Sequence, residues 1–365
     1  MKILIVFNHP APYKVNLYNE INKKLPLEVI FERKTASNRD EKFYALNKYE
    51  FDHIFLKRGA FGEEQTNTNE LVKILKHNKY DLIIMNGYSN ITELKAISWM
   101  NRHHIKWVLF INGGIIKQEN FIKRHIKQKY ISSASWYFSP CEQADEYLRY
   151  YGAKQDKIMH YPNSTIFKSQ LINKPLNNDE KNELRKQLGL PLNKKIFISP
   201  CQFISRKNNF QLLSNFKGRD EVLLLIGSGP EKEQYLTYIK QNKMDNVIIL
   251  PYKDSNELPK YYQASNCFIT LSKEDIYGHT TNEAMSQGIP AISSNNVVAS
   301  LYLIKDNVNG FVVNLNNNDE IQHAISNVND SMYVPALKTA LDNTIETSSE
   351  VLVNHILRIL NKWDI

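Results

Sequence analysis

The sequence contains few cysteines and no arrangement of them that forms a recognisable site. Only three occur in the 365 residues, Cys141, Cys201 and Cys267, and none belongs to a C-x-x-C pair. An odd number of widely separated cysteines argues against a disulfide framework and against a zinc site built from such pairs. Few unpaired cysteines are typical of a protein from a reducing compartment.

Long apolar runs are also missing. The N-terminal MKILIVFNHPAP carries one lysine and an apolar run that is shorter than the core of a secretory signal peptide. No run elsewhere approaches the roughly 18 residues that a membrane span needs. We therefore expect residues 2–7 to form a buried first strand. We expect the protein to be cytoplasmic, or peripheral on the inner face of a membrane.

Positive charge is in excess in the first half of the chain. The net charge is +8; residues 1–168 carry 26 lysines and arginines against 17 acids, whereas residues 169–365 carry 20 against 21. Such asymmetry indicates that the first half faces an anionic partner, such as an acidic membrane surface, a phosphate-bearing substrate or nucleic acid. Because no recognised nucleic-acid motif is present, we expect no nucleic-acid partner.

Short β-rich apolar runs alternate with stretches of helical length, as in parallel sheets covered by helices on both faces. Two such series are separated near 163–193 by a polar stretch with two prolines. The sequence therefore predicts an α/β protein with two Rossmann-like doubly wound domains, over 1–168 and 169–345. An amphipathic helix over 346–365 is expected to follow and to pack back on the first domain. The predicted strands are 2–7, 27–31, 53–56, 81–85, 107–111, 136–139, 157–161, 194–199, 221–227, 246–250, 267–272, 290–294 and 310–313.

The stretch EDIYGHTTNEAMSQGIP, 274–290, holds two acids eight residues apart, Asp275 and Glu283. It follows the predicted strand 267–272 and precedes a helix predicted over 280–287, so Gly278 lies just before the first helical turn. Helix N-termini present free N–H groups to phosphate, and a glycine lets the ligand approach closely. Carboxylates accept hydrogen bonds from paired hydroxyls, as on a ribose or a sugar ring. The pattern suits a site for a nucleotide sugar, although the two acids taken alone also fit a glutamate that favours a helix N-terminus and a solvated aspartate.

This stretch resembles the hallmark of retaining glycosyltransferases of family 4, which have the GT-B fold of two facing Rossmann-like domains. Asp275 stands where that family usually has its first glutamate, and Ile276 replaces its first glycine. The segments 223–235 and 306–313 resemble further parts of the family pattern, and 160–164 resembles the end of its first domain. The positions that match the hallmark in register are Gly278, Glu283, Ala284, Met285, Gly288 and Pro290.

The resemblance implies roles for the residues of the acid motif. Glu283 would bind the nucleotide ribose, and Asp275 would lie near the donor sugar. The backbone amides around Gly278, His279 and Thr280 would hold the distal phosphate and the sugar.

The resemblance also implies a cationic clamp on the diphosphate. Lys207 matches the family lysine, whereas Gln202 stands where an arginine is usual, and Arg206 lies beside Lys207. Such a clamp stabilises a leaving group that departs with growing negative charge, although Arg206 and Lys207 also fit a solvated helix start. Gly227 and Gly229 resemble the family's Gly-x-Gly-Pro turn and are expected to contact the nucleotide sugar.

In the first domain, Asn112 takes the place at which many relatives have a histidine near the donor sugar. Asparagine can bind a sugar hydroxyl but cannot exchange a proton at neutral pH. Gly113 and Gly114 permit close approach of a ligand on the acceptor side. The loop expected over 8–14 has two prolines instead of a glycine-rich turn, and His9 in it lies near the acceptor or is structural.

The segment 116–138 interleaves basic with apolar and aromatic residues. A basic amphipathic helix can lie on an anionic membrane and reach a lipid-linked acceptor, although a solvated basic helix has the same composition.

The sequence thus predicts transfer of a sugar from a nucleotide sugar, with a UDP-sugar expected, to a glycan or lipid-linked acceptor. The resemblance implies retention of configuration and a place in bacterial surface polysaccharide synthesis. No metal or other cofactor is expected. A nucleotide-sugar epimerase and a non-catalytic sugar-binding accessory protein remain alternatives. A dehydrogenase is disfavoured, because GSGPEK (227–232) lacks the third glycine of the dinucleotide fingerprint.

Overall fold

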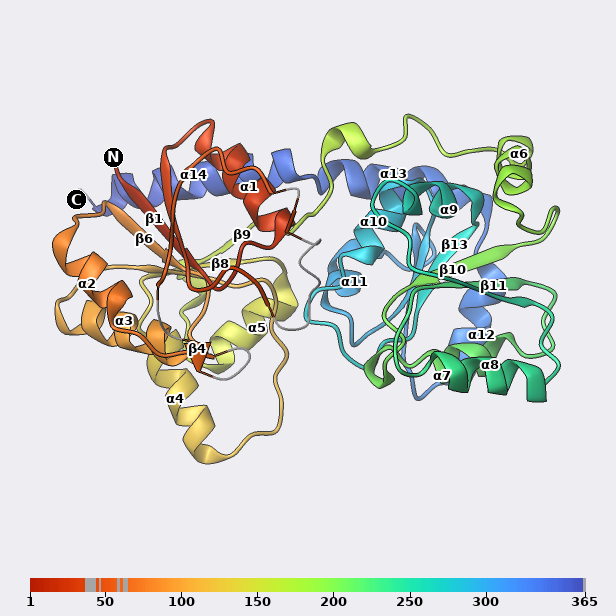
Figure 1. The fold of residues 1–365 in the computed structure, drawn as a ribbon, viewed down its shortest axis with the longest axis horizontal. Coiled ribbons are helices and arrows are strands. Elements are labelled where there is room, and N and C mark those ends of the chain that lie inside the picture. The colour runs from red at the N-terminus through yellow and green to blue at the C-terminus, as the bar shows by residue number, and fades with distance from the viewer. Residues whose placement is uncertain (37–43, 46, 58–59, 62–64, 364–365) are drawn as a thin grey trace. The chain divides into compact units, whose positions relative to one another are not determined.

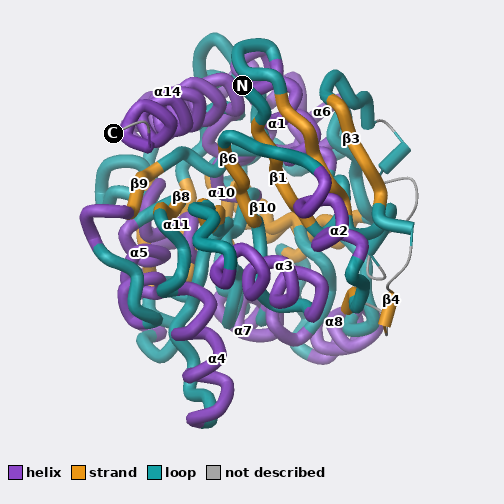
Figure 2. Tube along the Cα trace, turned by 90° about the vertical axis from the view of Figure 1, so that its left-hand side faces the viewer, coloured by secondary structure: helices purple, strands orange, loops and turns teal. Residues whose placement is uncertain are grey.

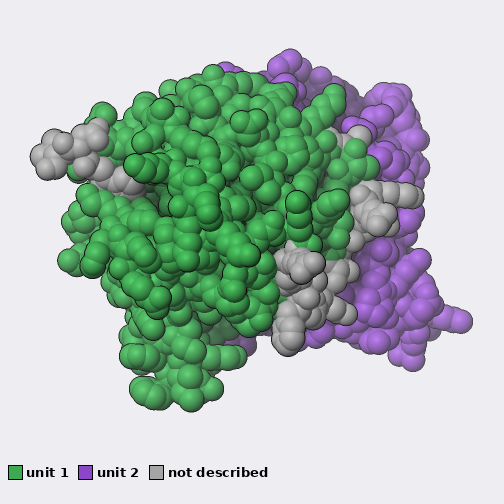
Figure 3. Space-filling model, turned by 60° about the vertical axis from the view of Figure 1, so that its left-hand side comes forward, with its two compact units in different colours: residues 1–165, 345–365 green, residues 166–344 purple. Residues whose placement is uncertain are grey.

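The structure is a computed structural model that describes the chain except for residues 37–43, 46, 58–59, 62–64 and 364–365. The chain forms two compact units, which Figure 3 colours separately. Unit 1 comprises Met1–Thr165 and Ile345–Ile365, and unit 2 comprises Ile166–Thr344. The chain therefore leaves unit 1 once and returns to it for its last helix.

Unit 1 is built on a parallel seven-stranded sheet with the order β3-β2-β1-β6-β7-β8-β9 (Figure 1). In β1, Ile3 pairs with Leu27 on one side and with Leu82 on the other. Every residue of that strand is buried, which accounts for its continuous apolar sequence. The strands are β1 (Ile3–Phe7), β2 (Leu27–Phe31), β3 (Asp52–Phe55), β6 (Leu82–Met85), β7 (Val108–Phe110), β8 (Trp136–Ser139) and β9 (Ile158–His160).

Helices connect these strands. The loop expected over 8–14 is shorter than predicted, because α1 begins at Pro12, and proline fits the first helical position. Asn90 and Glu93 form a capping box at the start of α3. The last helix of the chain packs along α1 (Figures 1 and 2). The helices are α1 (Pro12–Asn22), α2 (Glu70–His77), α3 (Ile91–Arg102), α4 (Phe121–Ile131), α5 (Glu142–Tyr150) and α14 (Ile345–Trp363).

Unit 2 has a parallel six-stranded sheet with the order β12-β11-β10-β13-β14-β15. A core that includes Phe197, Leu223 and Ile269 fills one side of the sheet. The strands are β10 (Ile196–Pro200), β11 (Val222–Ile226), β12 (Val247–Leu250), β13 (Cys267–Thr270), β14 (Ala291–Ser294) and β15 (Gly310–Val313).

The helices of unit 2 follow the stop and start signals of the sequence. The first of them ends at Gly189, whose φ of 66° is the left-handed conformation that glycine adopts without strain. The helices are α6 (Asn178–Leu188), α7 (Asn209–Phe216), α8 (Lys232–Gln241), α9 (Leu258–Ala264), α10 (Thr280–Ser286), α11 (Val298–Leu303), α12 (Asn318–Asn327) and α13 (Tyr333–Asp342).

The predicted α/β class with two doubly wound Rossmann-like domains is confirmed, and each predicted strand is present with small differences at its ends. That the two domains face each other across a cleft stays a prediction. A short antiparallel hairpin of β4 (Ala60–Phe61) and β5 (Gln65–Thr66) was not predicted.

Candidate functional site

The predicted donor-site residues lie where the strand order of unit 2 reverses. The chain runs from β10 outward to β12 and starts again at β13, on the other side of β10. Open α/β sheets bind ligands at such a switch point, outside the carboxyl ends of the strands. The loop after β10 holds Gln202, Arg206 and Lys207, and the loop after β13 holds Asp275. The fold therefore brings residues that are about 70 positions apart to one edge of the sheet.

Lys207 and Asp275 form the charged centre of this edge. The Lys207 Nζ donates to Asp275 Oδ2 at 2.7 Å, and the Arg206 guanidinium lies 3.7 Å from the same oxygen. Burial alone would raise the pKa of Asp275. The charges of Lys207 and Arg206 and the Tyr277 N–H outweigh burial and hold that pKa below its ordinary value. Asp275 is therefore a carboxylate at neutral pH.

The backbone fixes the two loops against each other. The Lys273 N–H donates to the Arg206 carbonyl at 2.8 Å. Ser205–Lys207 form a 3-10 turn, and Asn208 then adopts the left-handed conformation with φ 56° before α7 begins. Asparagine tolerates that conformation better than most residues. Lys207 is thus held at a turn rather than on a freely moving loop.

Gly278 forms the turn that leads from Asp275 into α10. Its φ of 91° is one that other residues adopt only with strain, and a Cβ there would lie 2.3 Å from Cγ1 of Val297. Asp275 itself forms a parallel bridge with Val297. The Thr281 N–H donates to the Gly278 carbonyl at 3.2 Å, which ties the glycine to the first turn of the helix.

Glu283 lies in the first turn of α10; the residue as a whole is partly exposed, but its carboxyl group is enclosed by protein atoms. Burial raises the pKa of its carboxyl to about 7, an effect that the nearby Tyr262 hydroxyl opposes. His279 is the residue before the helix, with its ring centroid 4.8 Å from that of Tyr277, and Thr280 is the first helical residue. The structure thus places these predicted residues at one helix end, and their contacts with a ligand stay predictions.

Gly227 and Gly229 let the loop after β11 pack on the loop after β10. A Cβ on Gly227 would lie 2.0 Å from the Cys201 carbonyl oxygen, and one on Gly229 would lie 2.5 Å from that of Phe203. Close backbone packing therefore explains both glycines without a ligand. Gln202 lies on the same loop with its side chain exposed.

In unit 1, Asn112, which was predicted to act near the donor sugar, and the predicted acceptor-side residues Gly113 and Gly114 follow β7. The Asn112 Oδ1 lies 3.4 Å from the Tyr161 hydroxyl, which also donates to a backbone carbonyl at 2.8 Å. A Cβ on Gly114 would lie 2.5 Å from the Tyr147 ring. These residues thus form a compact loop at the carboxyl end of the strand.

His9 follows β1, and its Nδ1 lies 3.2 Å from the Tyr44 hydroxyl. The two rings meet edge to face with centroids 5.7 Å apart. His9 therefore has a structural partner, and its proximity to an acceptor stays a prediction.

Lys14 is a buried cation that the sequence did not reveal. It is fully buried in α1, and its Nζ lies 4.2 Å from the centroid of the Phe110 ring. Burial lowers the pKa of its amine to about 7. The only sequence signal was a lysine inside a largely apolar helix start, which is also common for a solvated side chain.

Helix α4 presents apolar side chains to solvent among basic ones. Phe121 is 80% exposed, Ile122 is 64% exposed and Ile126 is 42% exposed. The basic residues of the helix are Lys123, Arg124, Lys127 and Lys129. The helix is shorter than the segment 116–138, because it ends at Ile131 and β8 begins at Trp136. Among the described residues, no helix has the length and apolar character to cross a membrane.

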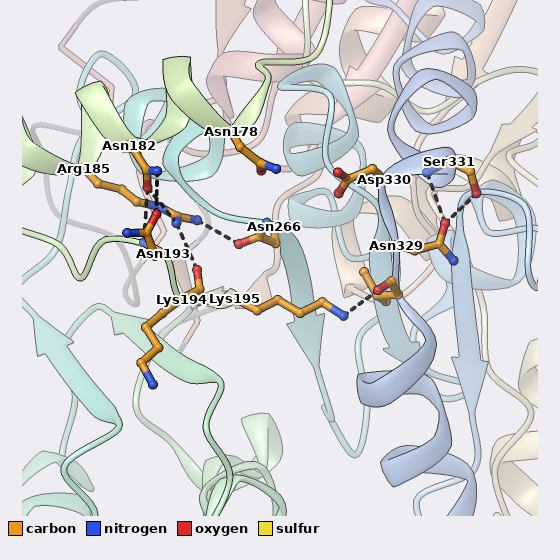
Figure 4. A pocket seen from close by; sticks show the side chains of 11 residues that line it. Asn178, Asn182, Arg185, Asn193, Lys194, Lys195, Asn266, Asn329, Asp330 and Ser331 are labelled. Atoms are coloured by element: carbon orange, nitrogen blue, oxygen red, sulfur yellow. Dashed lines mark hydrogen bonds between the residues drawn. The ribbon is translucent and has the colours of Figure 1, made fainter.

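Two further features lie away from the predicted donor site. A polar pocket of about 750 Å³ lies at the amino ends of β10 and β13, the opposite edge of unit 2 (Figure 4). The Arg185 side chain lies in the wall of this pocket and donates to the Lys194 carbonyl and to Asn266 Oδ1. These hydrogen bonds give the guanidinium a structural role. In unit 1, the structure brings together Glu142, Asp145 and His160, which no motif in the sequence connects.

Comparison with known proteins places this geometry among GT-B structures. Over 99% of this chain and all of the other, the structure resembles HepE of Anabaena solved with UDP, at a TM-score of 0.76 and 16% identity. It resembles a glycosyltransferase of Rickettsia africae at a TM-score of 0.73 and 17% identity, covering 99% of this chain and 98% of that one. The lipopolysaccharide outer core galactosyltransferase WaaB gives a TM-score of 0.73 at 15% identity, covering 98% and 99%. The fold therefore defines a GT-B protein.

Residues 180–332 match the family model of glycosyl transferases group 1. Over 170 residues it is 26% identical to an Escherichia coli protein named UDP-Gal:alpha-D-GlcNAc-diphosphoundecaprenol alpha-1,3-galactosyltransferase. That match spans 44% of this chain and 43% of the relative. The resemblance noted from the sequence is confirmed for the group, and the retaining family 4 stays a prediction.

Proposed function

We propose that the protein is a glycosyltransferase that moves a sugar from a UDP-sugar to a glycan or lipid-linked acceptor with retention of configuration. The observation that carries the proposal is the Lys207–Asp275 pair beside the Gly278 turn, at the switch point of unit 2. The E. coli relative, whose name gives UDP-galactose as the donor, and HepE solved with UDP support the choice of nucleotide.

The charges suit a diphosphate leaving group. Without a ligand, Asp275 holds the Lys207 ammonium at 2.7 Å. In the proposed reaction the diphosphate takes over Lys207 and Arg206, and these cations stabilise the charge that grows as the sugar bond breaks. Asp275 stays anionic and accepts hydrogen bonds from hydroxyls of the donor sugar. The leaving phosphate oxygen then accepts the proton of the acceptor, so no protein base is required. We propose that turnover needs neither added metal nor another cofactor, which assays with and without Mg²⁺ or Mn²⁺ check.

The decisive experiment is a UDP-release assay over a panel of UDP-sugars, with product analysis. Lys207→Ala should lower turnover about 10²–10³-fold, the effect of removing one pre-positioned charge donor. Lys186→Ala is the matched control, because Lys186 also pairs with a carboxylate, Glu183 at 3.3 Å, but is 61% exposed on α6. Equal turnover of both variants would contradict the site.

The same product analysis separates the alternatives. An epimerase would change the free nucleotide sugar and form no glycoside. A non-catalytic sugar-binding protein would bind a UDP-sugar, seen as a rise in melting temperature, without turning over any donor.

For the acceptor, we propose a lipid-linked sugar at an anionic membrane surface, in bacterial surface polysaccharide synthesis. The name of the E. coli relative specifies a diphosphoundecaprenol acceptor, which supports this choice. The exposed apolar residues of α4 among its basic side chains suit the headgroup region of a membrane. The protein would then be cytoplasmic and peripheral on the inner membrane face.

Co-sedimentation with vesicles tests the membrane contact. Phe121→Ser with Ile122→Ser should abolish binding to vesicles that contain anionic lipid, and salt should weaken the binding of the wild type. Tyr252→Ser is the control, since Tyr252 is 72% exposed on unit 2. Binding of the double variant at the wild-type level would exclude α4 as the contact.

A further inference from the structure

Three side chains of types that commonly bind metal ions lie close together at the carboxyl ends of β8 and β9 in unit 1. Glu142 and Asp145 lie in the first turn of α5, which follows β8. His160 is the last residue of β9 and pairs in register with Ser139, the last residue of β8. One ligand atom from each of Glu142, Asp145 and His160 lies within 4.8 Å of the other two.

Asp145 supplies an independent sign of a ligand. Its side chain is completely buried, and its Oδ2 lies 2.5 Å from the His160 Nε2. Its Oδ1 is also buried and has no hydrogen-bond partner among the described residues. A buried carboxylate oxygen without a partner is costly, because it has lost water without gaining another contact. The unused oxygen belongs to the same carboxylate that already faces the other two ligands.

We propose that Glu142, Asp145 and His160 bind one divalent transition-metal ion, with Zn²⁺ as the best fit. One imidazole and two carboxylates are zinc ligands, and a water completes the tetrahedron. An imidazole ligand disfavours Mg²⁺ and Ca²⁺, which prefer oxygen.

The geometry is within reach of a zinc site. Ligand bonds of about 2.0–2.2 Å place the ligand atoms of a tetrahedral site about 3.3 Å apart. Glu142 and His160 can adjust to this spacing, because their side chains are 63% and 53% exposed, whereas Asp145 is fixed by burial. Glu142 pairs with Arg149 at 2.8 Å, but such an exposed ion pair is weak and can be given up.

A metal here would fasten the start of α5 to the end of β9. It would also reach the last helix indirectly, since the His355 ring of α14 lies 2.7 Å from the His160 carbonyl oxygen. The ion would therefore act on the cohesion of unit 1, and the proposal does not depend on the reaction proposed for unit 2.

Titration of the EDTA-treated, desalted full chain with Zn²⁺ against a chromophoric chelator tests the site. The wild type should bind one equivalent, and Asp145→Asn and His160→Gln should each weaken that binding by at least roughly tenfold. His77→Gln is the matched control, because His77 is an exposed histidine on α2. Co²⁺ in place of Zn²⁺ should give the visible absorption bands of a tetrahedral site in the wild type and in the control.

The proposal is overturned if the wild type binds no Zn²⁺ equivalent, or if His160→Gln binds it as tightly as His77→Gln. Should Asp145→Asn fail to fold, Glu142→Gln and His160→Gln decide the matter, since both side chains are largely exposed and their replacement leaves the core intact.

Discussion

The Gly278 turn makes a quantitative prediction, because substitution there meets two separate obstacles. Gly278→Ala would force a side chain into a backbone with φ 91° and place its Cβ 2.3 Å from Cγ1 of Val297. The left-handed strain costs about 1–2 kcal/mol. Overpacking against a buried methyl adds about 1–3 kcal/mol. We expect a total loss of about 2–5 kcal/mol in the stability of unit 2.

Two controls separate the obstacles. Gly189→Ala carries a similar strain, since its φ is 66°, but a Cβ there meets nothing within 4 Å, so it should cost only about 1–2 kcal/mol. Val297→Ala removes the methyl that the new side chain would strike. The double variant Gly278→Ala/Val297→Ala should therefore be more stable than the sum of the single effects by about 1–3 kcal/mol.

Thermal melting of the unit 2 transition measures these differences. For a unit of this size, 1 kcal/mol shifts the melting temperature by about 2–4 °C, so Gly278→Ala should lower it by about 4–20 °C. The inferred contact between the Gly278 turn and Val297 is wrong under two conditions together: Gly278→Ala melts no lower than Gly189→Ala, and the double variant is no more stable than the sum of the single effects.

Three further predictions concern pH. Burial raises the Glu283 pKa from 4.5 to about 7, so the folded state holds more protons than the unfolded state between these pH values. Unit 2 should therefore lose stability as pH rises from 4.5 to 7. Glu283→Gln should remove this dependence of the melting temperature on pH, measured from pH 4 to 8. The carboxylate is the form that accepts ribose hydroxyls, so UDP affinity measured by calorimetry should rise more steeply as pH passes 7 in the wild type than in Glu283→Gln. Burial lowers the Lys14 pKa from 10.5 to about 7, so the unfolded state holds more protons between these values and unit 1 should gain stability as pH rises through them. Lys14→Met should stabilise unit 1 most at pH 6 and least above pH 10; an equal gain at both would show that the amine is not buried as a cation.

The sheets could be predicted from the sequence because buried parallel strands are continuous apolar runs, such as LEVIF at β2. Helix ends were readable where a glycine stops the helix, as at Gly189. The β4–β5 hairpin was missed because two-residue strands carry no periodic signal. The start of α1 is ambiguous in the sequence, because Pro12 fits both a loop and a first helical position, where proline is favoured.

The candidate site could be predicted from the sequence only in part, for a different reason. The acid motif is local in sequence, so the position of Asp275 and Glu283 around a turn and a helix start could be read directly. The pairing of Lys207 with Asp275 depends on the adjacency of β10 and β13, which strand patterns do not reveal. Likewise, no sequence spacing joins Asp145 to His160, because they meet only through the pairing of β8 with β9.

The return of the chain to unit 1 has a consequence for synthesis on the ribosome. Unit 2 is one continuous segment, whereas unit 1 also needs α14, which follows unit 2 in the chain and in which Leu352, Val353 and Ile356 are buried. During translation unit 2 can complete its core first, while the surface of α1 that α14 covers stays open to chaperones and proteases. A nascent chain that stalls before residue 345 would therefore carry a folded unit 2 and an incompletely folded unit 1. Folding of unit 1 thus depends on the synthesis of α14.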